Sequence, residues 1–219
     1  MSSNRFFEVQ AILFDMDGTI VDSSVPVHKA WRAWGDSLCI PFERVQAVMH
    51  GRRAIETMQM LAPELPQPES AERFLASEAL DLEGIVEIPG AGSFVRSLPV
   101  DRWAVVTSAT QGMARDRMRA AGLPVPGVLV SADMVSRGKP DPECFLMAAE
   151  RLGVAAERCL VFEDAPAGIA AGRAAGMEVV GVSTHYEGEE LGVEFAVRDF
   201  RGAVVHRLPG GGLLVDVKD

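Results

Sequence analysis

Apolar residues follow two different patterns along the chain, and the change between them divides it. A short apolar run at 11–14 predicts a buried strand, and similar runs predict later strands at 103–107, 128–130, 159–162, 179–182 and 194–197. Stretches of helical character separate most of these later runs, at 112–121, 142–152 and 165–175. Strands that alternate with helices of crossover length predict a parallel sheet covered by helices on both faces.

Residues 23–85 have a different character, because they contain no convincing strand run. Helical patterns occur at 28–37, 42–49, 54–61 and 71–82, interrupted by Pro41 and the proline-containing stretch 63–68. We therefore expect an α/β fold: a Rossmann-like, doubly wound parallel sheet formed by 1–22 and 86–219. A small helical domain of residues 23–85 would be inserted after the first strand.

The last part of the chain predicts a β-hairpin. Apolar-rich runs at 204–208 and 213–217 flank the sequence Pro-Gly-Gly-Gly, which favours a tight turn. We expect this hairpin to close one edge of the sheet.

The first predicted strand ends in two carboxylates, Asp15 and Asp17, followed by Gly18. Residues two apart in an extended chain point to the same side, so both carboxylates can reach one spot. Carboxylates this close repel each other unless a cation lies between them. An acidic turn that merely ends a strand is the alternative interpretation.

Polar residues also follow three other predicted strands. They are Thr107, Ser108, Lys139, Glu163 and Asp164. The carboxyl ends of parallel strands meet at one edge, where ligands bind in folds of this kind. Carboxylates suit Mg²⁺, whereas hydroxyls and a lysine suit phosphate oxygens. One aspartate could attack phosphorus and another could transfer the proton.

Composition limits the partners and the cellular compartments that are compatible with such a site. The chain has 219 residues and a net charge of -10, which argues against a nucleic-acid or anionic-membrane partner. Its 3 cysteines lack C-x-x-C spacing and are typical of a reducing compartment. Because we find neither a secretory signal nor an apolar run of about 18 residues, we expect a cytoplasmic protein.

Four motifs in order resemble those of the haloacid-dehalogenase-like hydrolase superfamily. They are Asp15-x-Asp17-Gly18-Thr19, Thr107-Ser108, Lys139-Pro140 and Glu163-Asp164. Residues 162–172 and the stretch His50-Gly51-Arg52-Arg53 resemble, more narrowly, small sugar-phosphate and glycerol-phosphate phosphatases with a helical cap. Under this resemblance, residues 23–85 correspond to the cap that closes over the substrate.

The resemblance implies a role for each acidic residue of the motifs. Asp15 would be the nucleophile and Asp17 the general acid and base. Mg²⁺ would be held by Asp15, the Asp17 carbonyl and Asp164, with Glu163 either on the ion or close to it without direct contact.

The resemblance also implies the substrate contacts. The transferring phosphoryl group would be held by Thr107, Ser108 and Lys139. In the cap, sugar hydroxyls or a distal phosphate would be contacted by His50, Arg52 and Arg53. Elsewhere we expect His185 and His206 to be surface or sheet residues, and the glutamates at 187, 189 and 190 to form a solvated face.

The resulting hypothesis is a Mg²⁺-dependent phosphatase that hydrolyses small sugar or polyol phosphates through an aspartyl-phosphate. A β-phosphoglucomutase-like phosphomutase could use the same residues and is one alternative. A non-catalytic scaffold that binds phosphorylated metabolites is another. The oligomeric state is open between monomer and homodimer.

Overall fold

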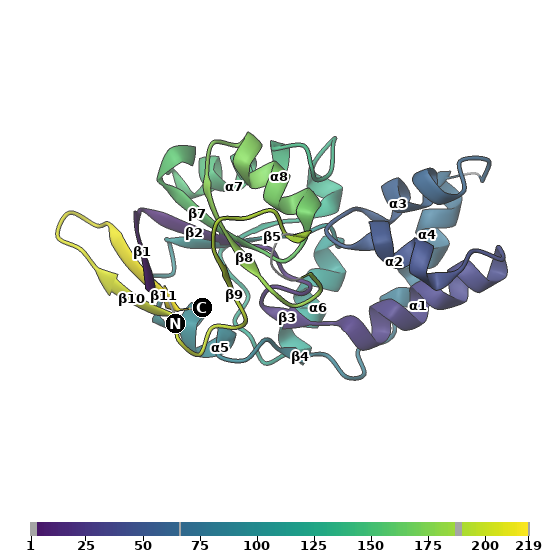
Figure 1. The fold of residues 1–219 in the computed structure, drawn as a ribbon, viewed down its shortest axis with the longest axis horizontal. Coiled ribbons are helices and arrows are strands. Elements are labelled where there is room, and N and C mark those ends of the chain that lie inside the picture. Colours follow the sequence, from purple (N-terminus) through teal and green to yellow (C-terminus); the bar gives the residue numbers. More distant parts are fainter. Residues whose placement is uncertain (1–3, 66, 187–189, 219) are drawn as a thin grey trace.

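A six-stranded parallel sheet forms the centre of the molecule (Figure 1). The computed structural model describes residues 4–65, 67–186 and 190–218. The strand order is β6-β5-β2-β7-β8-β9, and every neighbouring pair is parallel. The strands are β2 (Ala11–Phe14), β5 (Trp103–Val106), β6 (Val128–Val130), β7 (Cys159–Glu163), β8 (Glu178–Val182) and β9 (Ala196–Val197). The predicted doubly wound α/β fold is confirmed, although the last strand is shorter than the predicted run 194–197.

Helices cover both faces of this sheet, as the alternation of strand side chains requires. They are α5 (Ala91–Ser97), α6 (Gln111–Ala120), α7 (Glu143–Leu152) and α8 (Pro166–Ala174), with short 3-10 turns at Ala132–Met134 and Ala156–Arg158. Ile12 and Phe14 pack toward α5 and α6, whereas Leu13 packs toward α7 and α8.

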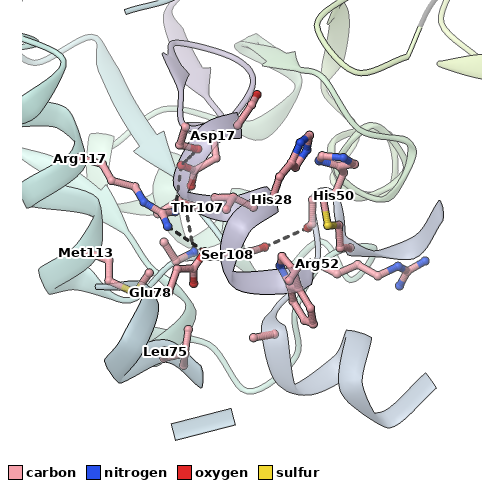
Figure 2. Close-up of a pocket in the computed structure, with 18 of the residues that line it drawn as sticks. Asp17, His28, His50, Arg52, Leu75, Glu78, Thr107, Ser108, Met113 and Arg117 are labelled. Carbon is pink, nitrogen blue, oxygen red and sulfur yellow. Dashed lines mark hydrogen bonds and ion pairs between the residues drawn. The ribbon is translucent and has the colours of Figure 1, made fainter. Parts of the chain in front are cut away.

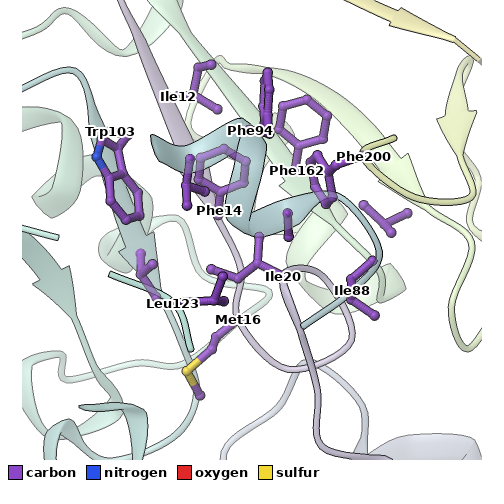
Figure 3. Close-up of a cluster of buried hydrophobic side chains, with 14 of the residues drawn as sticks. Ile12, Phe14, Met16, Ile20, Ile88, Phe94, Trp103, Leu123, Phe162 and Phe200 are labelled. Carbon is purple, nitrogen blue, oxygen red and sulfur yellow. The ribbon is translucent and has the colours of Figure 1, made fainter. Parts of the chain in front are cut away.

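Aromatic rings fill the centre of the α5 and α6 side (Figure 3). Phe14 stacks on Phe162 of the neighbouring strand at 5.4 Å between ring centroids, and Phe94 stacks on Phe200 at 5.6 Å. All four rings are buried. Because burial of such side chains is the main stabilising contribution in a core, this cluster anchors β2 next to β7.

Four helices form a separate group to one side of the sheet, which we call the helical unit (Figure 1). They are α1 (Ser24–Ser37), α2 (Phe42–Met49), α3 (Ala54–Leu61) and α4 (Gln67–Glu78). Its own apolar cluster includes Trp31, whose ring lies 4.3 Å from that of Phe74. Two short strands join the helical unit to the sheet, and these strands, β3 (Val21–Asp22) and β4 (Val86–Glu87), pair antiparallel.

The two ends of the chain form a second sheet. The strands β1 (Asn4–Val9), β10 (Val204–Arg207) and β11 (Leu213–Lys218) are antiparallel, in the order β1-β11-β10. The predicted hairpin is therefore confirmed, but the prediction that it closes an edge of the parallel sheet was wrong. It pairs with β1 instead, because alternate residues of β11 (Leu213, Val215 and Val217) pack into the core beside Phe7 and Val9.

Within the residues that the structure describes, no helix is both long enough and apolar enough to cross a membrane.

Candidate active site

The carboxyl ends of three adjacent strands bring the predicted motifs together. Phe14 lies opposite both Val105 and Phe162 in the sheet, so the residues that follow each strand are neighbours. Asp15 comes after β2, Thr107 after β5, and Glu163 and Asp164 at the end of β7.

Lys139 reaches this point from the loop after β6 and is almost fully buried. Its ammonium group donates to Asp15 Oδ1 at 2.5 Å, to Glu163 Oε1 at 2.7 Å and to the Val106 carbonyl at 3.2 Å. Burial alone would lower the pKa of Lys139, but the charges of Asp15 and Glu163 outweigh burial and raise it. The lysine is therefore a cation at neutral pH.

The acidic residues around it carry more negative charge than Lys139 can balance. Burial raises the pKa of Asp15 to about 7, an effect that Lys139 opposes. Burial also raises the pKa of Glu163 and of Asp164. One oxygen from each of the three carboxylates lies within 4.8 Å of the others. A divalent cation that prefers oxygen ligands fits this cluster.

Glu163 uses both of its oxygens within the protein. Oε1 accepts from Lys139, and Oε2 accepts from the Ala165 backbone N–H at 2.8 Å. The geometry therefore assigns Glu163 first to Lys139 and the Ala165 backbone.

The turn after β2 depends on Gly18. Its φ of +91° lies in the left-handed region, which favours glycine. A Cβ at this position would lie 2.3 Å from Asp164 Oδ2. The same close approach places Thr19 beside Asp164, and the Thr19 hydroxyl donates to Asp164 Oδ1 at 3.3 Å.

Asp17 has partners that link it to the helical unit (Figure 2). Its Oδ1 accepts from the Ser23 hydroxyl at 2.6 Å and from Arg117 at 3.0 Å. The same guanidinium donates to Glu78 Oε1 at 2.9 Å. Arg117 belongs to α6 and Glu78 to the end of α4, so this buried ion-pair chain crosses from the core to the helical unit.

The sequence reasoning did not identify Arg117 or Glu78 as site residues. One signal was available for Arg117, because it shares the buried face of α6 with Met113, Ala114 and Met118. A charged residue on an otherwise apolar helix face indicates a buried partner. Glu78 offered no comparable signal.

A cavity separates these core residues from the helical unit. It encloses ≈ 670 Å³ of empty space, part of it open to solvent. Asp15, Asp17 and Thr107 line its core side, whereas His50 and Arg52 line the opposite side.

The two predicted hydroxyl groups already have local partners. Thr107 Oγ1 accepts from the Ala109 backbone N–H at 3.0 Å. Ser108 Oγ donates to the Gly51 carbonyl at 2.9 Å, which ties the loop between α2 and α3 to the core. Both residues line the cavity.

Arg53 lies apart from the cavity lining. Its guanidinium is paired with Glu56 and donates to the carbonyls of Val135 and Ser136, each at 3.3 Å. The neighbouring Arg52 lines the cavity, with its guanidinium directed away from Asp17 (Figure 2).

His185 occupies a position that the sequence reasoning did not expect. It is half-buried at the cavity, with Nδ1 2.7 Å from Asp164 Oδ2 and Nε2 3.3 Å from Ser24 Oγ. Burial lowers the pKa of His185, but the hydrogen bond and charge of Asp164 outweigh burial and raise it. The expectation that His185 is a surface or sheet residue was wrong, because the loop after β8 turns back over the strand ends.

For His206, which is exposed in β10, the same expectation is confirmed. Of the predicted charge run, residues 187 and 189 lie outside the described residues, and Glu190 is exposed.

The fold and the strand-end cluster agree with the family comparison. The family model described as "haloacid dehalogenase-like hydrolase" matches residues 9–176. The chain therefore belongs to the haloacid dehalogenase-like hydrolases.

Individual relatives agree with this assignment. The chain is 36% identical to hexitol phosphatase A of Escherichia coli over 212 residues, which cover 94% of this chain and 98% of the relative. It is 35% identical to glycerol-1-phosphate phosphohydrolase 2 of Saccharomyces cerevisiae, over 82% of this chain and 77% of the relative. Among solved structures, a hydrolase from Pseudomonas syringae superposes with a TM-score of 0.77 at 29% identity, covering 87% of this chain and 94% of that one.

Proposed function

We propose that this protein is a Mg²⁺-dependent phosphatase that hydrolyses small phosphorylated sugars or polyols through an aspartyl-phosphate intermediate. The main observation that supports the proposal is the buried contact of the Lys139 ammonium group with Asp15, which belongs to an acidic cluster with Glu163 and Asp164 and lines the cavity. The substrate class is supported by the names of the relatives, a hexitol phosphatase and a glycerol-1-phosphate phosphohydrolase.

The first chemical step transfers the phosphoryl group to Asp15. A carboxylate oxygen of Asp15 attacks phosphorus while the bond from phosphorus to the sugar oxygen breaks. Asp17 donates a proton to that leaving oxygen. Lys139 balances the charge on Asp15 and lies close enough to meet an oxygen of the phosphoryl group.

The second step releases inorganic phosphate. Asp17, now a carboxylate, takes a proton from water as the water attacks phosphorus, and the bond from phosphorus to Asp15 breaks. Mg²⁺ held by Asp15, the Asp17 carbonyl and Asp164 would supply positive charge beside the phosphoryl oxygens and favour the ionised form of Asp15. Thr107 would donate a hydrogen bond to those oxygens through its hydroxyl, and Ser108 would donate through its backbone N–H, because the Ser108 hydroxyl already donates to the Gly51 carbonyl.

We further propose that residues 23–85 form a cap domain on a core of residues 1–22 and 86–219. Two contacts that cross the cavity support this division, Ser108 with Gly51 and Arg117 with Glu78. His50 and Arg52 would contact the sugar or polyol. Arg53 would hold their loop against the loop after β6 through its carbonyl contacts.

The cellular setting we propose is the cytoplasm, with the protein as a monomer or homodimer. Cys39, Cys144 and Cys159 are all free thiols, in agreement with a reducing compartment.

Substitution of the nucleophile tests the mechanism. We expect Asp15→Asn to abolish phosphate release from an aryl phosphate and from glycerol 1-phosphate while the far-UV circular dichroism spectrum is unchanged. Asp116→Asn is a matched control, because Asp116 is exposed and, among the residues that the structure describes, pairs only with Arg119 on the same helix. Full turnover by Asp15→Asn would contradict the aspartyl-phosphate mechanism.

Two further measurements test the metal and the reaction type. Exhaustive chelation should stop phosphate release, and added Mg²⁺ should restore it. With glucose 1-phosphate and a bisphosphate primer, we expect inorganic phosphate to accumulate; formation of an isomeric sugar phosphate would instead establish a phosphomutase. A phosphate-release screen across hexose, pentose and polyol phosphates would then identify the preferred substrate.

A further inference from the structure

Three of the 4 histidines of the chain meet at the cavity, from three separate segments. His28 lies in α1, His50 follows α2, and His185 lies in the loop after β8. One ring nitrogen from each lies within 4.8 Å of one from each of the others. His28 and His50 belong to the helical unit, whereas His185 belongs to the core, so this cluster spans the cavity.

Two of these imidazoles have a ring nitrogen without a partner. His28 Nε2 and His50 Nε2 are buried, and neither makes a hydrogen bond to any part of the chain that the structure describes. Buried polar atoms in native proteins are nearly always paired, so two unpartnered nitrogens in one histidine cluster indicate a ligand.

His185 is held in a way typical of a metal-binding histidine. Its Nδ1 lies 2.7 Å from Asp164 Oδ2, and a carboxylate on one ring nitrogen commonly orients the other toward a metal. The other nitrogen, Nε2, contacts Ser24 Oγ at 3.3 Å, a long contact that an ion could replace.

We propose that His28, His50 and His185 form a binding site for a transition-metal ion of the Zn²⁺ class, and that an ion bound there clamps the helical unit to the core and inhibits hydrolysis. Imidazole ligands suit Zn²⁺, Cu²⁺ and Ni²⁺, whereas the carboxylates of Asp15 and Asp164 suit Mg²⁺. The two sites therefore differ in ligand chemistry. The inhibition rests on the proposed function, but the binding of the ion does not.

The protonation state of His28 and His50 favours metal binding, whereas His185, whose pKa is raised by Asp164, must lose a proton to bind an ion. Burial lowers the pKa of His28, and it lowers the pKa of His50 to about 3. Both rings are therefore neutral at pH 7 and each offers a lone pair.

One histidine ring must move before all three can bind the same ion. The rings of His50 and His185 are stacked, with centroids 4.0 Å apart and planes inclined by 24°, and the His28 centroid lies 5.9 Å and 6.2 Å from them. A tetrahedral ion holds its nitrogens at about 2.0 Å, and hence roughly 3.3 Å from each other. His50 must therefore turn out of the stack, which its position in the loop after α2 allows. Because the site is not preorganised, we expect weaker binding than at a structural zinc site.

Cobalt titration in the presence of saturating Mg²⁺ tests the site without any substrate. Tetrahedral Co²⁺ absorbs strongly in visible light, whereas octahedral Co²⁺ in an oxygen site absorbs weakly. We expect the wild-type protein to develop the strong band with one Co²⁺ per chain, and added Zn²⁺ to remove it. His28→Ala and His28→Gln should both lose the band.

His206→Ala is the matched control, because His206 is exposed in β10 and far from the cavity lining. It should retain both the band and inhibition by Zn²⁺, whereas His28→Ala should need at least about tenfold more Zn²⁺ for half-inhibition. Thermal unfolding would show that each variant is folded, and Zn²⁺ should raise the melting temperature of the wild type but not that of His28→Ala.

Three results would overturn the proposal: no strong band in the wild type, an equal band in His28→Ala, or equal inhibition of the two proteins by Zn²⁺. A raised KM for polyol phosphates in His28→Ala, without any Co²⁺ band in the wild type, would instead show that these histidines contact substrate hydroxyls. Since the spectroscopic arm contains no substrate, its outcome is independent of whether the protein is a phosphatase.

Discussion

Arg117 links the helical unit to the core through charge, and replacing it by methionine measures the strength of that link. The side chain is 5% exposed and donates to both Asp17 and Glu78. Methionine fills a similar volume and can pack against Met113 and Met118, which share the buried face of α6. Arg117→Met therefore removes the cation with little change in packing.

The expected loss follows from the burial of the two carboxylates. Removing one partner of a buried ion pair costs about 3–5 kcal/mol, because the remaining charge is left buried and unpaired. The Glu78 side chain is 7% exposed and that of Asp17 is 25% exposed, so most of the cost falls on Glu78. We expect the free energy of unfolding to fall by about 3 kcal/mol. For a chain of this length that corresponds to a melting temperature lower by roughly 6–12 °C.

The loss of unfolding free energy in Arg117→Met should depend on pH. Burial raises the pKa of Glu78 in the folded protein, and Arg117 opposes this rise. In Arg117→Met the pKa should rise further, so the folded variant binds a proton more tightly than the unfolded chain does. A carboxyl whose folded pKa is raised contributes its stability at low pH and loses it as pH rises through the folded value. The destabilisation should therefore be larger at about pH 8 than at about pH 5.5.

Thermal unfolding followed by circular dichroism measures this effect, with two further variants for comparison. Arg119→Met is the matched control, because Arg119 lies on the same helix but is 64% exposed, and we expect a change within about 0.5 kcal/mol. Combining Arg117→Met with Glu78→Gln should recover part of the loss, since the unpaired charge is then absent. A melting temperature for Arg117→Met equal to that of Arg119→Met, or strictly additive effects in the double variant, would refute the reasoning.

The remaining predictions concern the contacts around Lys139 and across the cavity. Gly168→Ala should abolish phosphate release and lower the melting temperature, because the added Cβ would lie 1.6 Å from Glu163 Oε1 and push this carboxylate away from Lys139. In contrast, a Cβ added at Gly112 would meet no described atom within 4 Å beyond its chain neighbours and its own helix backbone, so Gly112→Ala should stabilise the protein by up to about 1 kcal/mol in the same melting assay. Equal losses in the two variants would count against the role of Glu163. Ser108→Ala removes the hydrogen bond to Gly51, worth about 1 kcal/mol, and should raise KM by up to about fivefold in steady-state assays with little change in melting temperature. An unchanged KM would show that this bond does not help to hold the loop over the substrate.

Local pattern was sufficient to predict most of the fold. The runs at β2, β5, β6, β7 and β8 are recognisable because every strand of a covered parallel sheet is continuously apolar. The helices α2 and α3 have the predicted bounds, 42–49 and 54–61, because proline or glycine lies close to most of their ends. By contrast, β1 was missed, and the hairpin was assigned to the wrong sheet. Both depend on pairing between the two ends of the chain, which no local pattern records.

The same division holds for the site. The sequence by itself determined which chemical groups follow the strands, since Asp15, Asp17, Lys139 and Asp164 each stand where an apolar run or its loop ends. Only the tertiary structure decided which charges pair. Arg117 and Asp17 are 100 residues apart in the chain, and His185 and Asp164 come from different loops. From the sequence alone, a carboxylate could pair with any cationic side chain of the chain. The folded structure determines the partner, because an ion pair is strong only at short range, about 3 Å, and away from water. Those two conditions exist only once the segments have packed together.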